Sequence, residues 1–421
     1  MEERRLTKEN AKNHGDMHVW LLELQMGGPY VLLYSQFGEF RDTCWGNGMA
    51  RLARIEVFAP DEIAIVHVMN RVVRRCFLLG NDEVTGKNYD HRKIWVEELL
   101  QRLAASFGID LLGFAILSNH FHLILRSRPD VAATWDDTEV ARRWLQLCPV
   151  RKNAEGLAEE PNEMELNTIR NDPQKLATIR LRLSDIAWWM RLLCQHIAVR
   201  ANHEDGEVGK FFQSRYRAVR LLDEAAILAC AAYVDLNPIR AAMAETLEAS
   251  DFTSVQRRIE SLEQLIATQE NTEAAVIEPP DHTHPTRSTM PGVPAPDRFL
   301  SPLTIDEQSG ELGPVASTSG FRCSDKGYLP LRLPAYLELL DWTARTLATG
   351  KQGSTPQDAL PLFARLGIEP KAWCNLVGEF GRLFHNVAGQ PQTVDRTRTR
   401  VGSHRYYMRK PARELFATSE A

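Results

Sequence analysis

The sequence predicts an α+β fold in which helices pack on an antiparallel sheet. Two segments, 62–71 and 111–126, are rich in β-branched and apolar residues with the alternation that is typical of strands. An amphipathic helix, His91–Phe107, is predicted between them, with its apolar residues on one stripe. The resulting order of strand, helix, strand and strand favours a helix packed against an antiparallel sheet.

Each predicted element follows from a local pattern. The helix at His91–Phe107 is followed by Gly108, a common helix terminator. Leu111–Arg126 is predicted to form two short strands with Ser118–Asn119 at the turn. Beyond residue 181 the predicted elements are a helix at Asp185–His203 capped by Ser184, a basic strand-like segment at Gly209–Leu222, a helix at Glu224–Leu236 capped by Asp223, and helices at Leu333–Leu347, Ser354–Leu366 and Trp373–Phe384.

Composition shifts along the chain predict its domain organisation. The expected segments are an N-terminal extension (1–48), with translation beginning at Met49; a main domain (49–270) with a polar insert (129–181); a proline-rich linker (271–297); and a small helical C-terminal domain (298–421) with a basic tail. All candidate site residues lie in the main domain.

The composition places the chain among soluble globular proteins. The 421 residues contain no apolar run near the roughly 20 residues that a membrane span needs. Seven scattered cysteines without a CxxC pair are typical of reduced thiols, so we expect a cytoplasmic protein. The net charge of −5 does not indicate nucleic-acid binding, although a local basic face is compatible with it.

The chemically informative stretch is the second of the paired strands, which opens with His120-Phe121-His122. Side chains alternate faces along a strand, so His120 and His122 share one face while Phe121 faces the core. Two imidazoles on a rigid strand form half of a metal site. The alternative is that both histidines are merely half exposed at the surface of the sheet.

A second candidate lies in the segment Ala231–Ala241. Tyr233 and Asn237 are four residues apart, so on a helix they project from the same face. One interpretation is a core tyrosine beside a helix-terminating Asn-Pro. The other is that Tyr233 supplies a nucleophilic oxygen and Asn237 an oxygen ligand to a metal bound by the histidines. The second interpretation requires this helix to cross the strand that carries His120 and His122.

Four motifs in this order give the chain a resemblance to a known family: HVMNR (67–71), SNHFHLILR (118–126), GKFFQSRYRAVRLLDE (209–224) and YVDLNPIRAAM (233–243). They resemble the HUH single-tyrosine transposases of the insertion sequence 200-like group, and most closely the REP-associated tyrosine transposases. The resemblance covers about 49–251. The insert at 129–181 and the region after Glu270 depart from the family's pattern.

The resemblance implies a ferredoxin-like antiparallel sheet with helices on one face. It also implies an enzyme that cleaves and rejoins single-stranded DNA at hairpin-flanked sites. In such enzymes two histidines and a polar residue bind Mg²⁺ or Mn²⁺, and the tyrosine forms a 5′-phosphotyrosine link. Carried over to this sequence, His120, His122 and Asn237 are the metal ligands and Tyr233 is the nucleophile. The polar ligand is Gln in one branch of the family and Asn in another.

Basic residues near these motifs are candidates for binding the DNA backbone, and neighbouring aromatic residues are candidates for base stacking. The candidates are Arg71, Lys210, Arg215, Arg217, Arg220 and Arg240, and the alternative for each is a solvated or core-pairing side chain. The expected partner is single-stranded DNA with a hairpin, with no membrane and with the protein as monomer or homodimer. Two other functions remain open: a DNA-binding protein that does not cleave, and a metal phosphodiesterase that uses water.

Overall fold

The computed structural model describes residues 57–59, 61–73, 78–82, 86–213, 215–277, 294–305, 313–349, 355–356, 359–402 and 406–417. The described residues all belong to one compact unit, Arg51–Ala421. The predicted N-terminal extension and the predicted start at Met49 therefore lie outside the described residues, as do residues 278–293 of the predicted linker.

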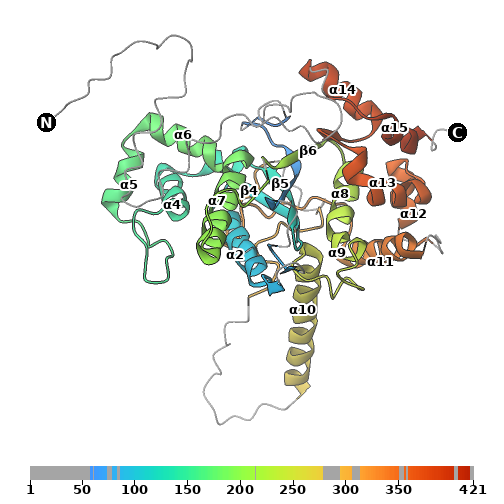
Figure 1. The fold of residues 1–421 in the computed structure, drawn as a ribbon, viewed down its shortest axis with the longest axis horizontal. Coiled ribbons are helices and arrows are strands. Elements are labelled where there is room, and N and C mark those ends of the chain that lie inside the picture. Colours follow the sequence, from blue (N-terminus) through green and yellow to red (C-terminus); the bar gives the residue numbers. More distant parts are fainter. Residues whose placement is uncertain are drawn as a thin grey trace. The chain divides into compact units, whose positions relative to one another are not determined.

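A five-stranded sheet lies at the centre of the described part of the chain (Figure 1). Its strand order is β4-β5-β1-β6-β7, and all neighbours are antiparallel except β6 and β7. The strands are β1 (Ile65–Arg71), β4 (Ile109–Ile116), β5 (His120–Ser127), β6 (Arg217–Leu221) and β7 (Val387–Ala388); a separate pair comprises β2 (Asn81–Asp82) and β3 (Lys87–Asn88).

The four long strands follow one another in space as the second, third, first and fourth in chain order. With α2 (His91–Ser106) between the first and second and α7 (Ile186–Asp205) before the fourth, this is the βαββαβ arrangement of ferredoxin-like folds. The predicted α+β fold class is confirmed. The hairpin β4–β5 turns at Ser118–Asn119 as the sequence predicted.

Both faces of the central strands are covered. Every residue of β4 and all but the first of β5 are buried, which is the pattern of a sheet packed on two sides. Helix α2 packs against β4 and α7, as expected from its apolar stripe. Helix α8 (Glu224–Asp235) packs against β4 and β5 from the side opposite to α2 and α7 (Figure 1). The face of β5 that carries His120 and His122 is therefore also covered by a helix.

The polar insert is itself helical. It forms four helices that bury apolar side chains such as Val140, Leu145 and Ile169 against one another and against α2. Helix α5 begins with a capping box in which Asn162 and Glu165 bond reciprocally. The helices of the insert are α3 (Pro129–Thr134), α4 (Asp137–Leu147), α5 (Glu163–Arg170) and α6 (Pro173–Leu183).

The region beyond residue 298 is mainly helical, as predicted, and it packs on the sheet and on α8. Strand β7 extends the sheet beyond β6, and α13 contacts α8. The remaining helices are α9 (Asn237–Arg240), α10 (Ser254–Ile277), α11 (Leu333–Thr349), α12 (Ala359–Leu366), α13 (Pro370–Leu383), α14 (Pro391–Val401) and α15 (Lys410–Ala417).

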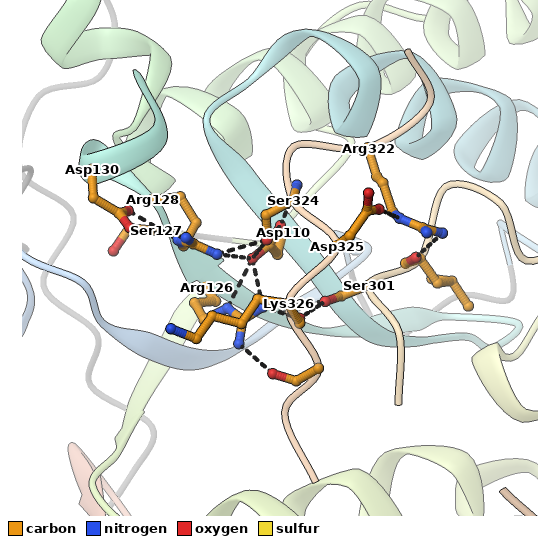
Figure 2. A network of polar contacts seen from close by, with 12 residues as sticks. Asp110, Arg126, Ser127, Arg128, Asp130, Ser301, Arg322, Ser324, Asp325 and Lys326 are labelled. Carbon is orange, nitrogen blue, oxygen red and sulfur yellow. Dashed lines mark hydrogen bonds and ion pairs between the residues drawn. The ribbon is translucent and has the colours of Figure 1, made fainter. Parts of the chain in front are cut away.

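A buried network of charges ties this region to the sheet (Figure 2). Asp110 of β4 accepts hydrogen bonds from Arg126 of β5 at 2.8 Å and from the Ser324 hydroxyl at 2.8 Å. Arg126 also donates to the carbonyl oxygen of Gly327 at 3.0 Å, and Arg128 donates to the Ser324 hydroxyl at 2.6 Å. The three charged side chains are almost fully buried, so each depends on these partners.

We expect Asp110→Ala to lower the free energy of unfolding by about 3–5 kcal/mol, because it leaves two buried guanidinium groups without their shared carboxylate. The matched control is Asp341→Ala, which breaks a solvent-exposed pair with Arg345 and should cost at most about 1 kcal/mol. Guanidinium-induced unfolding of both variants measures the difference. Equal losses would show that the network does not stabilise the fold.

Candidate functional site

Strand β5 presents the two predicted histidines on one face. His122 is buried and His120 is partly exposed, and their ring centroids lie 5.0 Å apart. In the pairing with β1, Arg71 lies opposite His120 and Met69 lies opposite His122. Directly opposed residues share a face of the sheet, so the odd-numbered positions of β1 line the histidine side.

A third histidine, which the sequence analysis did not assign to the site, lies on this face. His67 of β1 is diagonal to His122, and its Nε2 lies 2.9 Å from His122 Nδ1, within hydrogen-bonding distance. The two rings are nearly parallel, 7° apart, with centroids separated by 5.1 Å. In the sequence, His67 opens the motif HVMNR, but its place at the site becomes visible only when the pairing of β1 with β5 is known.

Burial keeps all three imidazoles neutral. Desolvation, with a smaller contribution from the positive charge of Arg217, lowers the pKa of His67 to about 3. Desolvation and the charge of Arg71 lower the pKa of His120 to about 4. The pKa of His122 is well below its usual value, again chiefly through burial. Neutral imidazoles have the lone pairs that a metal ion requires.

Helix α8 brings Tyr233 to the histidines. Asp223 caps the helix by accepting a hydrogen bond from the backbone N–H of Ala226 at 3.0 Å. The small alanines of α8 allow close packing on β4 and β5. The Tyr233 ring lies edge-on to His122, with centroids 5.4 Å apart, and edge-on to His67 at 5.9 Å. The structure therefore brings the predicted nucleophile and histidines together within one chain.

Asn237, the predicted third ligand, is the first residue of α9 and is buried. Helix α8 ends at Asp235, so Asn237 belongs to the next short helix rather than to the helix of Tyr233, and its role as a ligand stays a prediction. Asp235, between them, is fully buried and accepts hydrogen bonds from the hydroxyls of Ser254 at 2.6 Å and Tyr336 at 2.7 Å. These bonds fix the end of α8 to α10 and α11.

Helix α13 forms another wall of the site. The Phe380 ring lies 5.5 Å from the Tyr233 ring and 6.0 Å from the His67 ring. Gly381 lies so close to Tyr233 that a Cβ at this glycine would be 2.9 Å from the tyrosine hydroxyl oxygen. The sequence carried no signal for this contact, since nothing local relates a helix at 370–383 to a tyrosine at 233.

The predicted DNA-binding residues fall into three groups. Arg71 and Arg240 adjoin the site: Arg71 faces His120 in the register, and the Arg240 guanidinium lies 4.9 Å from the Tyr233 ring centroid and donates to the carbonyl oxygen of Gly378. Lys210 and Arg215 are exposed just before β6.

Arg217 and Arg220 are held by other parts of the protein. Arg217 donates to the carbonyl oxygen of Phe384, just beyond α13. Both terminal nitrogens of Arg220 bond the Glu62 carboxylate, at 2.7 and 2.8 Å, and this pair is largely shielded from solvent on the arginine side. The ion pair occupies the donors that a phosphate would need.

The predicted ligands are of types that a divalent metal ion accepts. Among the described residues, no group of three or more His, Cys, Asp or Glu side chains is arranged to hold a metal. The predicted set is of another kind, with two imidazoles and the amide oxygen of Asn237. The Nε2 atom of His122 is buried without a hydrogen-bond partner in the described part of the chain, and an atom of this kind fits a ligand. Mixed nitrogen and oxygen ligation is compatible with Mn²⁺.

Comparison with known proteins finds a partial likeness to a solved structure. No family model and no curated protein matches the sequence. The structure, described as that of a REP-associated tyrosine transposase bound to a REP hairpin, is 10% identical, with a TM-score of 0.27, over 55% of this chain and 92% of its own. A score this low does not establish a common fold. Within the described residues no helix has the length and hydropathy to cross a membrane.

We expect Gly381→Ala to displace the Tyr233 hydroxyl while leaving the protein folded. The added methyl meets the far end of a side chain that is able to shift, and alanine in place of glycine favours a helix by about 0.5–1 kcal/mol. The matched control is Gly378→Ala, one turn earlier on α13, where the added methyl meets Leu347.

Incorporated fluorotyrosine and ¹⁹F NMR provide the measurement, with Tyr233→Phe identifying the resonance. The Tyr233 signal should shift in Gly381→Ala and stay in place in Gly378→Ala, with thermal stability retained in both. An unmoved signal in Gly381→Ala would show that α13 does not touch the tyrosine in solution.

Proposed function

We propose that this protein is a metal-dependent enzyme that cleaves and rejoins single-stranded DNA, at hairpin-flanked sites, through a covalent link to Tyr233. The observation that supports this is the packing of Tyr233 against His122, a buried imidazole whose Nε2 has no hydrogen-bond partner among the described residues. A tyrosine beside a candidate metal-binding pair is an arrangement that is suited to nucleophilic attack on a phosphodiester.

In this proposal His120, His122 and Asn237 hold Mg²⁺ or Mn²⁺. The bound ion would supply charge stabilisation to the non-bridging oxygens of the scissile phosphate. The neutral imidazoles are available as ligands at neutral pH because burial lowers their pKa values. Tyrosine is mostly protonated at neutral pH, so its hydroxyl must lose a proton on attack.

The covalent step balances without a co-reactant. The Tyr233 oxygen attacks phosphorus, its proton passes to solvent, and the bond from phosphorus to the 3′ oxygen breaks. The products are a 5′-phosphotyrosine and a free 3′-hydroxyl, which takes up a proton. Reversal on another strand rejoins DNA, because the phosphotyrosine retains the energy of the phosphodiester. In this proposal Tyr233 acts in the site of its own chain, and the packing of its ring against His122 of the same chain supports this.

Arg71 and Arg240 are the basic side chains best placed to bind the phosphates that flank the scissile bond. Lys210 and Arg215 would extend this basic surface along the bound DNA. We omit Arg220 from the proposed interface because of its two hydrogen bonds to Glu62. We also omit Arg217, because it donates a hydrogen bond to the carbonyl oxygen of Phe384 at the end of α13.

The test is to incubate the protein with hairpin-flanked single strands and Mn²⁺ or Mg²⁺, and to look for a denaturant-resistant adduct. Label at the 3′ end of the strand should migrate with the protein, and label at the 5′ end should be released on a shorter fragment. Tyr233→Phe should abolish the adduct, while Tyr407→Phe, the same change at a half-exposed tyrosine outside the site, should retain it.

Two other outcomes would replace the proposal. Cleavage that survives Tyr233→Phe would indicate a phosphodiesterase that uses water. Binding without cleavage in either metal would indicate a DNA-binding protein in which the site is not used.

A further inference from the structure

His67 has no role in the function proposed above, yet it makes the one side-chain hydrogen bond of His122 that the structure shows among the described residues. Both imidazoles are buried, with exposed fractions of 5% for His67 and 2% for His122. The bond runs from one ring edge to the other between nearly parallel planes, so it fixes the orientation of the His122 ring.

This hydrogen bond is compatible with two tautomers of His122. They differ in whether His122 Nε2 carries a proton or a lone pair. If His67 Nε2 donates, His122 Nδ1 is the acceptor. The proton of the neutral His122 ring then lies on His122 Nε2, where it is buried without a partner among the described residues. A buried donor of this kind costs about 1–3 kcal/mol. If His122 Nδ1 donates, the Nε2 atom carries a lone pair, and a metal ion satisfies it.

His120 shows the same pattern by a separate contact. Its Nδ1 lies 2.6 Å from the side-chain oxygen of Asn119, which only accepts hydrogen bonds. His120 must therefore donate from Nδ1, which leaves Nε2 unprotonated in the neutral ring. Both histidines thus have Nδ1 bonded to a neighbour and Nε2 available, as is usual for metal-binding histidines whose other nitrogen is held by a second residue.

We propose that His67 is a positioning residue of the site: it accepts the Nδ1 proton of His122 and thereby fixes the tautomer and orientation in which His122 presents Nε2 to the metal. In this state His67 carries its own proton on Nδ1. The proposal rests on the metal-binding role of His122 in the proposed function, and it assigns His67 no contact with DNA or with the reacting atoms.

The first experiment measures Mn²⁺ binding by calorimetry in the absence of DNA. His67→Leu removes the acceptor while keeping an apolar side chain, and we expect Mn²⁺ affinity to fall about 10- to 100-fold. His67→Gln, whose carbonyl oxygen replaces Nε2 as an acceptor, should restore most of the affinity. Met69→Leu is the matched control, because Met69 lies opposite His122 on the same face and the change conserves volume.

The second experiment needs no metal. In protein labelled with ¹⁵N-histidine, two-bond correlations between ring protons and nitrogens distinguish the tautomers. The His122 signals, identified by their loss in His122→Ala, should show the proton on Nδ1 in the wild type. In His67→Leu that preference should be lost, and in His67→Gln it should return.

These measurements separate the inference from the function on which it rests. Suppose that the wild type binds Mn²⁺ and that His122→Ala does not. If His67→Leu then binds Mn²⁺ as tightly as the wild type, the role of His67 is overturned and the metal site stands. If the wild type binds no Mn²⁺, the metal-dependent function is overturned. A wild-type His122 protonated on Nε2 overturns the inference whatever the metal result.

Discussion

The register of β1 against β5 is the constraint on which the site depends. Residues that face each other across these strands share one side of the sheet, so His67 and His122 meet only in this alignment. A slip of one residue would carry His67 to the opposite face. The register is held by the buried apolar residues of the other face, where Val66 and Val68 lie opposite Leu125 and Leu123. Packing on one side of the sheet thus determines the chemistry on the other.

Elements with a strong local pattern could be predicted from the sequence. The helices α2, α7 and α8 and the hairpin β4–β5 have clear apolar periodicity or capping residues, and all occur close to the expected positions. Strand β7 is two residues long, too short for any periodicity, and it exists because β6 offers it an edge. The insert was predicted as a polar segment, and its four short helices are held by packing against one another and against α2.

The predictable part of the site is the part that lies within one element. The alternation of His120 and His122, and the one-turn spacing of Tyr233 and Asn237, are visible in single segments. The contributions of His67 and of α13 depend on which strands and helices become neighbours. Arg220 illustrates the reverse case, since its charge suggested DNA while its carboxylate partner, Glu62, lies far away in sequence. The ligand and nucleophile roles of these residues stay predictions until the site is tested.

The buried charges around Asp110 have a consequence for how this chain is able to change in evolution. Arg126 lies within the region that resembles the transposase family, and its hydrogen bonds reach Ser301 and Gly327, which lie outside it. Losing the C-terminal region by a single deletion would remove these hydrogen bonds and expose the ion pairs of Asp110 with Arg126 and Arg128 to solvent. We therefore expect the C-terminal region and the sheet to change together in evolution, since both supply partners to the same buried network.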